Sequence, residues 1–200
     1  ETLEAAVKTA GYMEEKPANV GRGIAVGNRG PGGGETVSAV TLNPDGSVLL
    51  STPVFDQGTG TYTTLQQVVA EELALSPDQV DITVWDTDLA AFDSGIGGSR
   101  GTRTASNAAF QATQQVKSQL MRLTSEQLGW PENELVLDGD KIKRQDTGES
   151  HLWATILAQA GHSITGQATV QDTGPAPVTA FCVQIAEVSV DPETGTIKLD

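Results

Sequence analysis

The stretch FDQGTGTYTTLQQVVAEEL, residues 55–73, joins three local structures that together decide the fold. It follows the apolar run SVLLSTPV, passes through a corner in which one residue separates two glycines, and continues as an amphipathic helix. Leu65, Val68, Val69 and Leu73 recur at helical spacing and give that helix one apolar stripe. The stretch therefore predicts a strand, a tight corner and a helix that packs its apolar face on a sheet.

The segments on either side continue this alternation. Before it, TVSAVTL and SVLLSTPV predict a hairpin that turns at residues 43–46, NPDG, because proline presets φ and glycine accepts the left-handed conformation. After it, VDITVWDT alternates as a half-buried strand does, and a long helical pattern follows over residues 104–128. Further along we expect a small hairpin in ELVLDGDKIKR, a short helix that Ser150 caps and Gly161 ends, and a last hairpin that turns at residues 192–195.

These elements predict an α+β fold of two layers. The sheet is mixed, and the helices of residues 63–74 and 104–128 pack on one of its faces because their apolar stripes are one-sided. With 200 residues, 38% of them hydrophobic, the chain can form one domain with its own core. We expect a single domain over residues 1–200, with a helix and connector in 1–20 and the domain proper in 21–200. The last residues, TIKLD, resemble a strand in mid-course, as in a piece of a longer polypeptide.

The charge and the rare residues exclude several functions. The formal net charge of −14 repels nucleic acid and anionic lipid, so neither is an expected partner. Cys182 is the single cysteine, and His151 and His162 lack zinc-ligand spacing, so we expect no internal disulfide and no protein metal site. We interpret Cys182 as an inert buried thiol. No run is long and apolar enough for a membrane span, and the N-terminus has no signal-peptide pattern.

Glycines gather at three places in the sequence. The segment GNRGPGGG, residues 27–34, has five glycines in eight residues; it excludes regular structure and is either a flexible tip or a backbone that approaches something closely. The corner in GTGTYT and the corner in DSGIGGSRGTRT both stand between a strand and a helix N-terminus, where free N–H groups and the helix dipole can bind an anion. The alternative is that these glycines only permit tight turns and close packing. Neither corner has the dinucleotide G-x-G-x-x-G pattern or a P-loop lysine.

Several blocks together resemble a known family. They are DGSVLLSTPVFDQGTGTYTTLQQVVAEEL, the DTD of residues 86–88, GIGGSRGTRTASNAA and AEVSVDPETGTIKL, in that order. The chain resembles the large subunits of the molybdenum hydroxylases, the family of xanthine dehydrogenase, aldehyde oxidase and carbon monoxide dehydrogenase. The resemblance implies a molybdopterin-binding domain fragment of a longer large subunit.

The resemblance also implies which residues line the cofactor. It assigns contacts with the pterin and phosphates of molybdopterin, whose dithiolene sulfurs hold the molybdenum, to Gln57, Gly58, Thr59, Gly60, Gly97, Gly98, Ser99, Arg100, Gly101 and Thr102. The chain departs from the family at Thr59, where the family has glutamine in a G-Q-G pattern, so a hydroxyl replaces an amide. No catalytic residue is expected in this chain, because the family's glutamate base lies in a later segment. Asp56 and Asp93 are expected to stabilise turns, Arg100 to face a phosphate, and Arg103 to form a surface ion pair.

The resemblance leaves two functional classes open. The first is a fragment of a molybdenum-dependent oxidoreductase that hydroxylates aldehydes, purines or N-heterocycles or oxidises carbon monoxide. Its expected partners are the rest of the large subunit and iron-sulfur and flavin subunits or domains. The second is a non-catalytic binding or docking module that keeps the fold without the cofactor. Of the possible compartments we favour the cytoplasm, with the periplasm after folded export as the alternative.

Overall fold

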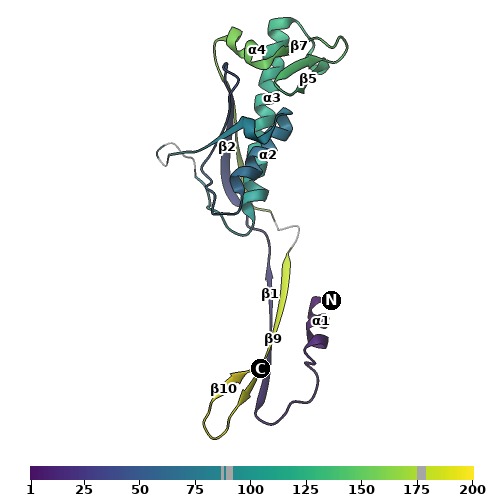
Figure 1. Cartoon of the computed structure of the whole chain (residues 1–200), viewed down its shortest axis with the longest axis vertical. Coiled ribbons are helices and arrows are strands. Elements are labelled where there is room, and N and C mark those ends of the chain that lie inside the picture. The colour runs from purple at the N-terminus through teal and green to yellow at the C-terminus, as the bar shows by residue number, and fades with distance from the viewer. Residues whose placement is uncertain (87, 89–91, 175–178) are drawn as a thin grey trace. The chain divides into compact units, whose positions relative to one another are not determined.

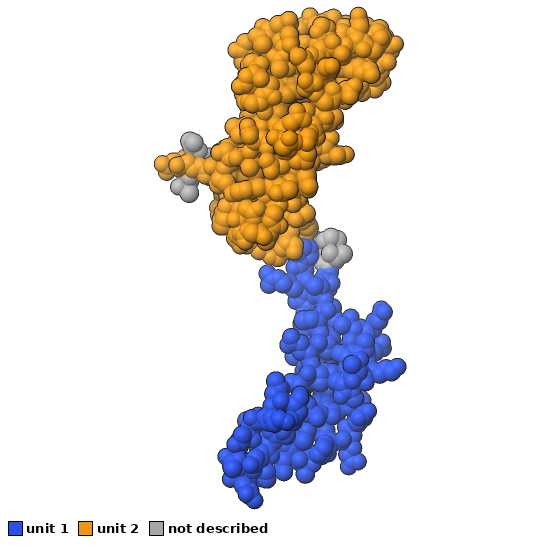
Figure 2. All heavy atoms as spheres, viewed as in Figure 1, with its two compact units in different colours: residues 1–31, 175–200 blue, residues 32–174 orange. Residues whose placement is uncertain are grey.

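The computed structural model describes residues 1–86, 88, 92–174 and 179–200. Its contacts divide the chain into two compact units, residues 1–31 with 175–200 and residues 32–174 (Figure 2). The expectation of a single domain over residues 1–200 stays a prediction.

The larger unit contains a four-stranded sheet in the order β4-β3-β2-β8. Its strands are β2 (Gly34–Leu42), β3 (Val48–Thr52), β4 (Val80–Val84) and β8 (Ile164–Asp172). β2 and β3 form the predicted hairpin and pair antiparallel, whereas β3 and β4 pair in parallel through the intervening helix. β8 returns from far along the chain to pair antiparallel with β2. The sheet is therefore mixed, as the sequence predicts.

Two helices lie against this sheet (Figure 1). They are α2 (Thr61–Leu73) and α3 (Ser106–Leu128), and α3 contacts β2, β8 and α2. Apolar side chains of the strands and of both helices form one buried core, which includes Val40, Leu42, Val48, Leu50, Leu65, Val69, Leu73, Ala109, Ala112, Val116 and Leu120. Of the predicted stripe on α2, Leu65, Val69 and Leu73 are buried and Val68 is partly exposed. The α+β fold is confirmed.

Gly166 of β8 sets how closely α3 approaches the sheet. A Cβ at this position would lie 2.2 Å from the carbonyl oxygen of Ala112 and 2.8 Å from the backbone nitrogen of Val116. Real Cβ atoms do not tolerate such distances to backbone, so only glycine allows the helix to pack at this depth.

The larger unit also contains several short helices and strands outside the four-stranded sheet. They are the 3₁₀ turns η1 (Pro77–Gln79) and η3 (Glu132–Glu134), the strands β5 (Leu135–Asp138), β6 (Lys141–Arg144) and β7 (Ser150–Leu152), and α4 (Trp153–Ala160). The hairpin of β5 and β6 and the helix that ends at Gly161 are confirmed. The prediction that Ser150 caps this helix is wrong: Ser150 pairs with Lys143 in β7, and the helix begins three residues later.

The smaller unit contains α1 (Thr2–Thr9) and a three-stranded sheet in the order β1-β9-β10. Its strands are β1 (Val20–Arg29), β9 (Ala180–Val190) and β10 (Ile197–Leu199). The last hairpin is as predicted, with its turn between β9 and β10. The prediction that residues 27–34 exclude regular structure is wrong, because β1 continues to Arg29 and β2 begins at Gly34.

Cys182 lies on β9 in this smaller unit. It is exposed, so its interpretation as a buried thiol is wrong. Its register partner on β1 is Gly27, and a Cβ on Gly27 would lie 3.2 Å from the Cys182 sulfur. The neighbouring strand therefore offers no side chain to cover the thiol.

Within the described residues, no helix combines the length and the apolar character that a membrane span needs. Over the same residues, no cluster of three or more His, Cys, Asp or Glu side chains could hold a metal ion. Thr87, which ends the predicted strand VDITVWDT, lies outside the described residues.

Candidate functional site

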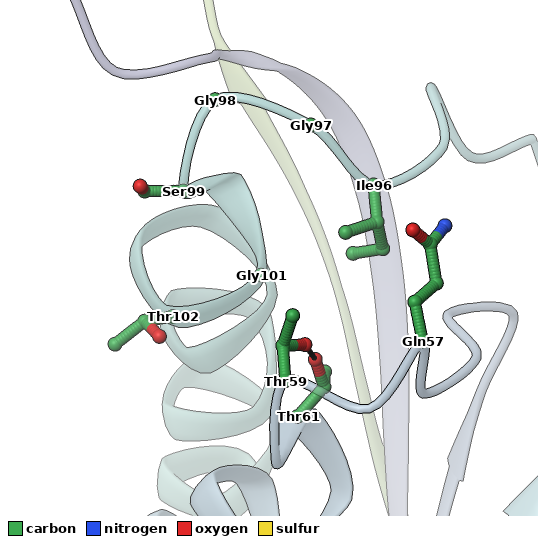
Figure 3. Close-up of a pocket in the computed structure, with 9 residues that line it drawn as sticks. All are labelled: Gln57, Thr59, Thr61, Ile96, Gly97, Gly98, Ser99, Gly101 and Thr102. Atoms are coloured by element: carbon green, nitrogen blue, oxygen red, sulfur yellow. Dashed lines mark hydrogen bonds between the residues drawn. The ribbon is translucent and has the colours of Figure 1, made fainter.

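Residues of both glycine corners line one pocket of about 360 Å³ in the larger unit (Figure 3). The corners are named here the first corner, residues 57–60, and the second corner, residues 97–102. The lining residues are Gln57, Thr59, Thr61, Ile96, Gly97, Gly98, Ser99, Gly101 and Thr102. Two segments about forty residues apart in sequence thus meet at one place. Gly58, Gly60 and Arg100, which were assigned to the same site from the sequence, do not line this pocket.

The first corner is closed by the carboxylate of Asp56. Its Oδ1 accepts hydrogen bonds from the backbone N–H groups of Gly58, at 2.8 Å, and Thr59, at 2.9 Å. Desolvation acts to raise the pKa of Asp56, but these backbone hydrogen bonds outweigh it and hold the pKa below its ordinary value. Asp56 therefore stabilises the turn, as predicted from the sequence. Because these two N–H groups already bind a carboxylate, they are not available to an anionic ligand.

The first corner contributes side chains to the pocket instead. The hydroxyls of Thr59 and Thr61 lie 2.9 Å apart, joined by the dashed line in Figure 3. One hydroxyl donates to the other, so the second retains a proton that it can donate to a ligand. The Gln57 amide lies beside the Ile96 side chain in the same view and adds a donor and an acceptor.

The second corner has an unusual backbone. Gly98 and Ser99 are both left-handed, with φ of +60° and +62°, and Ser99 adopts this conformation although it carries a side chain. The chain then enters α3 through the π-helical turn η2 (Gly101–Ala105). π-Helical turns are rare in proteins, and those that occur are often found at functional sites. An added Cβ at Gly97 would meet no atom within 4 Å, so the wall of the pocket at this residue is open backbone.

The second corner lies next to the start of α2 at Gly101. A Cβ on this residue would lie 3.4 Å from the Thr61 hydroxyl oxygen and 3.5 Å from the end of the Ile96 side chain, which is ordinary van der Waals distance. In the view of Figure 3, the side chains of Ser99 and Thr102 point to the opposite side of their helix from Thr59 and Gln57.

Arg100, in the second corner, and Arg103, directly after it, are both bound to carboxylates of the protein. Arg100 is only 3% exposed, and its guanidinium donates to Asp93 and to backbone carbonyls, so in this structure it does not face an open phosphate site. Arg103 forms an ion pair with Asp172 at 2.9 Å and is half-buried. The expected ion pair of Arg103 is therefore present. Among the described residues that line the pocket none has a charged side chain, so the chemistry they offer is that of hydroxyls, an amide and backbone groups.

Two lining residues, Thr61 and Ile96, were not predicted from the sequence. Thr61 is the first residue of α2 and lies two positions after Thr59, and its side chain points back to the corner rather than into the core. The alternation Thr59, Thr61 is the only signal that could have indicated it. Ile96 precedes the glycines of the second corner, and nothing in its local sequence distinguishes it from a core residue.

Comparisons with known proteins give this pocket its context. A sequence profile described as the molybdopterin cofactor-binding domain matches residues 2–200. The chain belongs to the molybdopterin cofactor-binding domain family. The resemblance to the molybdenum-hydroxylase large subunits is thereby confirmed.

Relatives of this chain include two bacterial proteins. It is 30% identical over 200 residues to "Probable hypoxanthine oxidase" of Escherichia coli, an alignment that covers 94% of this chain and 21% of the relative. It is also 30% identical over 212 residues to the gamma subunit of the 6-hydroxypseudooxynicotine dehydrogenase complex of Paenarthrobacter nicotinovorans, covering 98% and 26%. The chain thus spans about a fifth to a quarter of the length of these relatives.

Solved structures share the fold at lower identity. Quinoline 2-oxidoreductase from Pseudomonas putida 86 matches 99% of this chain with a TM-score of 0.65 at 19% identity, and the match covers 29% of that chain. A copper- and molybdenum-containing carbon monoxide dehydrogenase matches 99% of the chain with a TM-score of 0.63 at 22% identity, again over 29% of its own length. These likenesses support the fold and not a particular substrate.

The pocket fits the pterin part of the family's cofactor. Gly97 offers open space along one wall, and the Gln57 amide with the Thr59 and Thr61 hydroxyls offers donors and acceptors along the other. A pterin ring presents both kinds of hydrogen-bonding group at its edge and needs no charged partner. The volume of about 360 Å³ is at the small end of the range for ligand pockets, as expected for part of a larger site.

Proposed function

We propose that this chain is the cofactor-binding part of a molybdenum-dependent oxidoreductase and that its two corners form part of the wall around molybdopterin. The observation that carries the proposal is the single pocket that both corners line in a chain of the molybdopterin-binding family. The enzyme's substrates would be aldehydes, purines, N-heterocycles or carbon monoxide, the classes that occur among its relatives.

In this proposal the two sides of the pocket contact the cofactor in different ways. Gln57, Thr59 and Thr61 donate to and accept from the edge of the pterin, and the glycines of the second corner let the ligand approach the backbone. Thr59 takes the place that glutamine has in the family, so a hydroxyl pair with Thr61 does the work of an amide. When bound, molybdopterin supplies redox chemistry at a molybdenum held by its dithiolene sulfurs. No residue of this chain is assigned to the chemical step.

The proposed enzyme works with partners. Relatives are named as the large chain of a carbon monoxide dehydrogenase and as the molybdenum-binding subunit of an aldehyde oxidoreductase, names that describe parts of complexes. We propose the remainder of a large subunit as the first partner of this chain, and iron-sulfur and flavin subunits or domains as the electron acceptors beyond it.

Substitution of Gly97 by valine in the complete subunit tests the proposal. Gly97 lines the pocket, its φ is not in the left-handed region, and an added Cβ meets no atom within 4 Å, so Gly97→Val is compatible with the fold but places a branched side chain where the ligand would lie. We expect molybdenum per polypeptide, measured by elemental analysis, to fall about tenfold, the effect of losing about 1.4 kcal/mol of binding. The thermal midpoint of the cofactor-free protein should be unchanged.

Gly174→Val is the matched control. Gly174 also has open space around its Cβ position and lies outside the pocket, so molybdenum content should equal that of the wild type. Equal molybdenum in the Gly97→Val and wild-type subunits would contradict the assignment of the pocket. A wild-type subunit without molybdenum would instead favour the docking module.

A further inference from the structure

The glycine-rich segment of residues 32–34 lies directly behind the second corner. A Cβ on Gly32 would lie 2.5 Å from the carbonyl oxygen of Gly97, and one on Gly34 would lie 2.5 Å from the Ser94 hydroxyl oxygen. The backbone N–H of Gly32 also donates to the carbonyl of Gly98. Of the two interpretations of this segment, close backbone approach is therefore the one that the structure supports for residues 32–34.

Arg100 connects this segment to the corner. Its Nε donates to the carbonyl of Gly33 at 2.8 Å, and its Nη2 donates to the carbonyl of Glu35 at 2.6 Å. Its Nη1 donates to both carboxylate oxygens of Asp93 at 3.1 Å and to the carbonyl of Gly95. The side chains of Arg100 and Asp93 are 4% and 10% exposed. The buried guanidinium of Arg100 thus links the second corner, to which Arg100 belongs, with the start of β2 and with the loop before the corner.

We propose that Arg100, held by Asp93, is a positioning residue that presets the backbone of the second corner for its ligand. The naming of that ligand as molybdopterin rests on the proposed function, whereas the contacts that hold the corner do not. Arg100 follows directly after Gly98 and Ser99, whose left-handed conformations need support, since a non-glycine residue at positive φ costs roughly 1–2 kcal/mol. A corner that is already ordered loses less entropy when it binds.

The geometry explains why this role needs arginine. Its planar guanidinium presents five N–H donors in fixed directions, and here they reach four acceptor residues in two chain segments, Gly33 and Glu35 in one and Asp93 and Gly95 in the other. Lysine has one ammonium group and cannot span them. Glutamine in place of Arg100 would leave Asp93 as a buried carboxylate without its cation, which destabilises a fold strongly. A second substitution, Asp93→Asn, removes that charge and so separates lost stability from lost positioning.

Arg103 provides the matched control. It lies three residues after Arg100, carries the same side chain and pairs with Asp172, and within the described residues its side chain forms no hydrogen bond with residues 32–35 or with the loop before the corner. Arg103→Gln therefore removes a partly exposed ion pair from the same helix start without releasing the corner.

The experiment compares the wild type with R100Q, R100K, R103Q and the double variant D93N/R100Q. The first readout is backbone amide hydrogen exchange over residues 96–102 in protein from a host that makes no molybdopterin, so that every site is empty. The second is the thermal midpoint, and the third is the molybdopterin content of the complete subunit from a competent host. We expect R100Q and R100K to exchange at least about tenfold faster in the corner, as follows from losing charged hydrogen bonds, and R103Q to match the wild type.

The double variant decides between positioning and plain stability. We expect D93N/R100Q to recover most of the thermal midpoint while its corner still exchanges rapidly and its molybdopterin content stays low. Recovery of exchange protection and cofactor content together with the midpoint would overturn the proposal, as would exchange in R100Q no faster than in R103Q. Fast exchange in R100Q combined with a wild-type subunit that binds no molybdopterin would support the positioning role and overturn the proposed function instead.

Discussion

Asp56 shows how a single carboxylate shapes the first corner, and it makes this corner sensitive to pH. The backbone hydrogen bonds from Gly58 and Thr59 lower its folded-state pKa below the ordinary 3.8, despite opposing desolvation. A group with a depressed folded pKa contributes stability above the unfolded value and loses it as the pH falls through the folded value. Asp56→Asn keeps an acceptor but loses the charge, so we expect a lower thermal midpoint than the wild type near neutral pH.

The pH dependence of the difference in thermal midpoint between the wild type and Asp56→Asn tests this account. The gap between the two midpoints should close as the pH falls below 3.8, because the wild-type carboxyl then becomes neutral as well. A gap that widens in acid would contradict this account. Gln57, the next residue, supplies a control: Gln57→Asn changes no charge, and its effect on the midpoint should not depend on pH.

Arg100 shows where residue-level prediction from sequence ends. The sequence identifies an arginine beside glycines at a helix start, which is compatible with binding a phosphate. Its actual acceptors include the carbonyls of Gly33 and Glu35, more than sixty residues earlier in the chain. No local pattern reports such a partner, so the direction of the guanidinium could not be predicted.

At the scale of elements, the contact between α3 and β8 depends on Gly166. We expect Gly166→Ala to destabilise the fold by about 1–3 kcal/mol or more, because its Cβ would meet rigid backbone of α3 at 2.2 Å and the helix must move outward. Chemical denaturation measures this as a shift of the midpoint at constant slope. Gly174→Ala, with open space around its Cβ position, should stay within about 0.5 kcal/mol of the wild type. Equal stability of the two variants would show that α3 does not pack at this depth.

The elements that the sequence predicts well are those with a strong period. α2 and α3 keep their apolar residues at helical spacing, and the hairpin of β2 and β3 has a turn with its own chemistry. β1 was not predicted because its glycines conceal the strand pattern. Its pairing with β9, from Val20 with Ser189 to Arg29 with Ala180, joins opposite ends of the chain. Such long-range pairing has no local signal, so the two compact units could not be predicted either.

At the scale of the whole molecule, the proposed function makes the pocket one part of a larger enclosure. Ligand sites usually bury most of their ligand, and the residues that line this pocket come from residues 57–61 and 96–102 of a chain that spans about a fifth to a quarter of its relatives. None of the lining side chains is charged, and the guanidinium of Arg100 is already bound to Asp93. If the wall contacts the cofactor as proposed, its described lining residues provide hydrogen-bonding groups and no cation to balance the phosphates.

The isolated chain of 200 residues should consequently fold without retaining molybdenum. Its larger unit has a continuous core between the sheet and the helices α2 and α3, so folding does not require the ligand. Binding is different, because an open site leaves each hydrogen bond in exchange with water at about 1 kcal/mol net, and the net charge of −14 opposes an anionic cofactor. Circular dichroism with elemental analysis of the isolated chain, beside the complete subunit as the control, measures both. Near-stoichiometric molybdenum in the isolated chain would overturn this prediction and would mean that residues 1–200 enclose the cofactor by themselves.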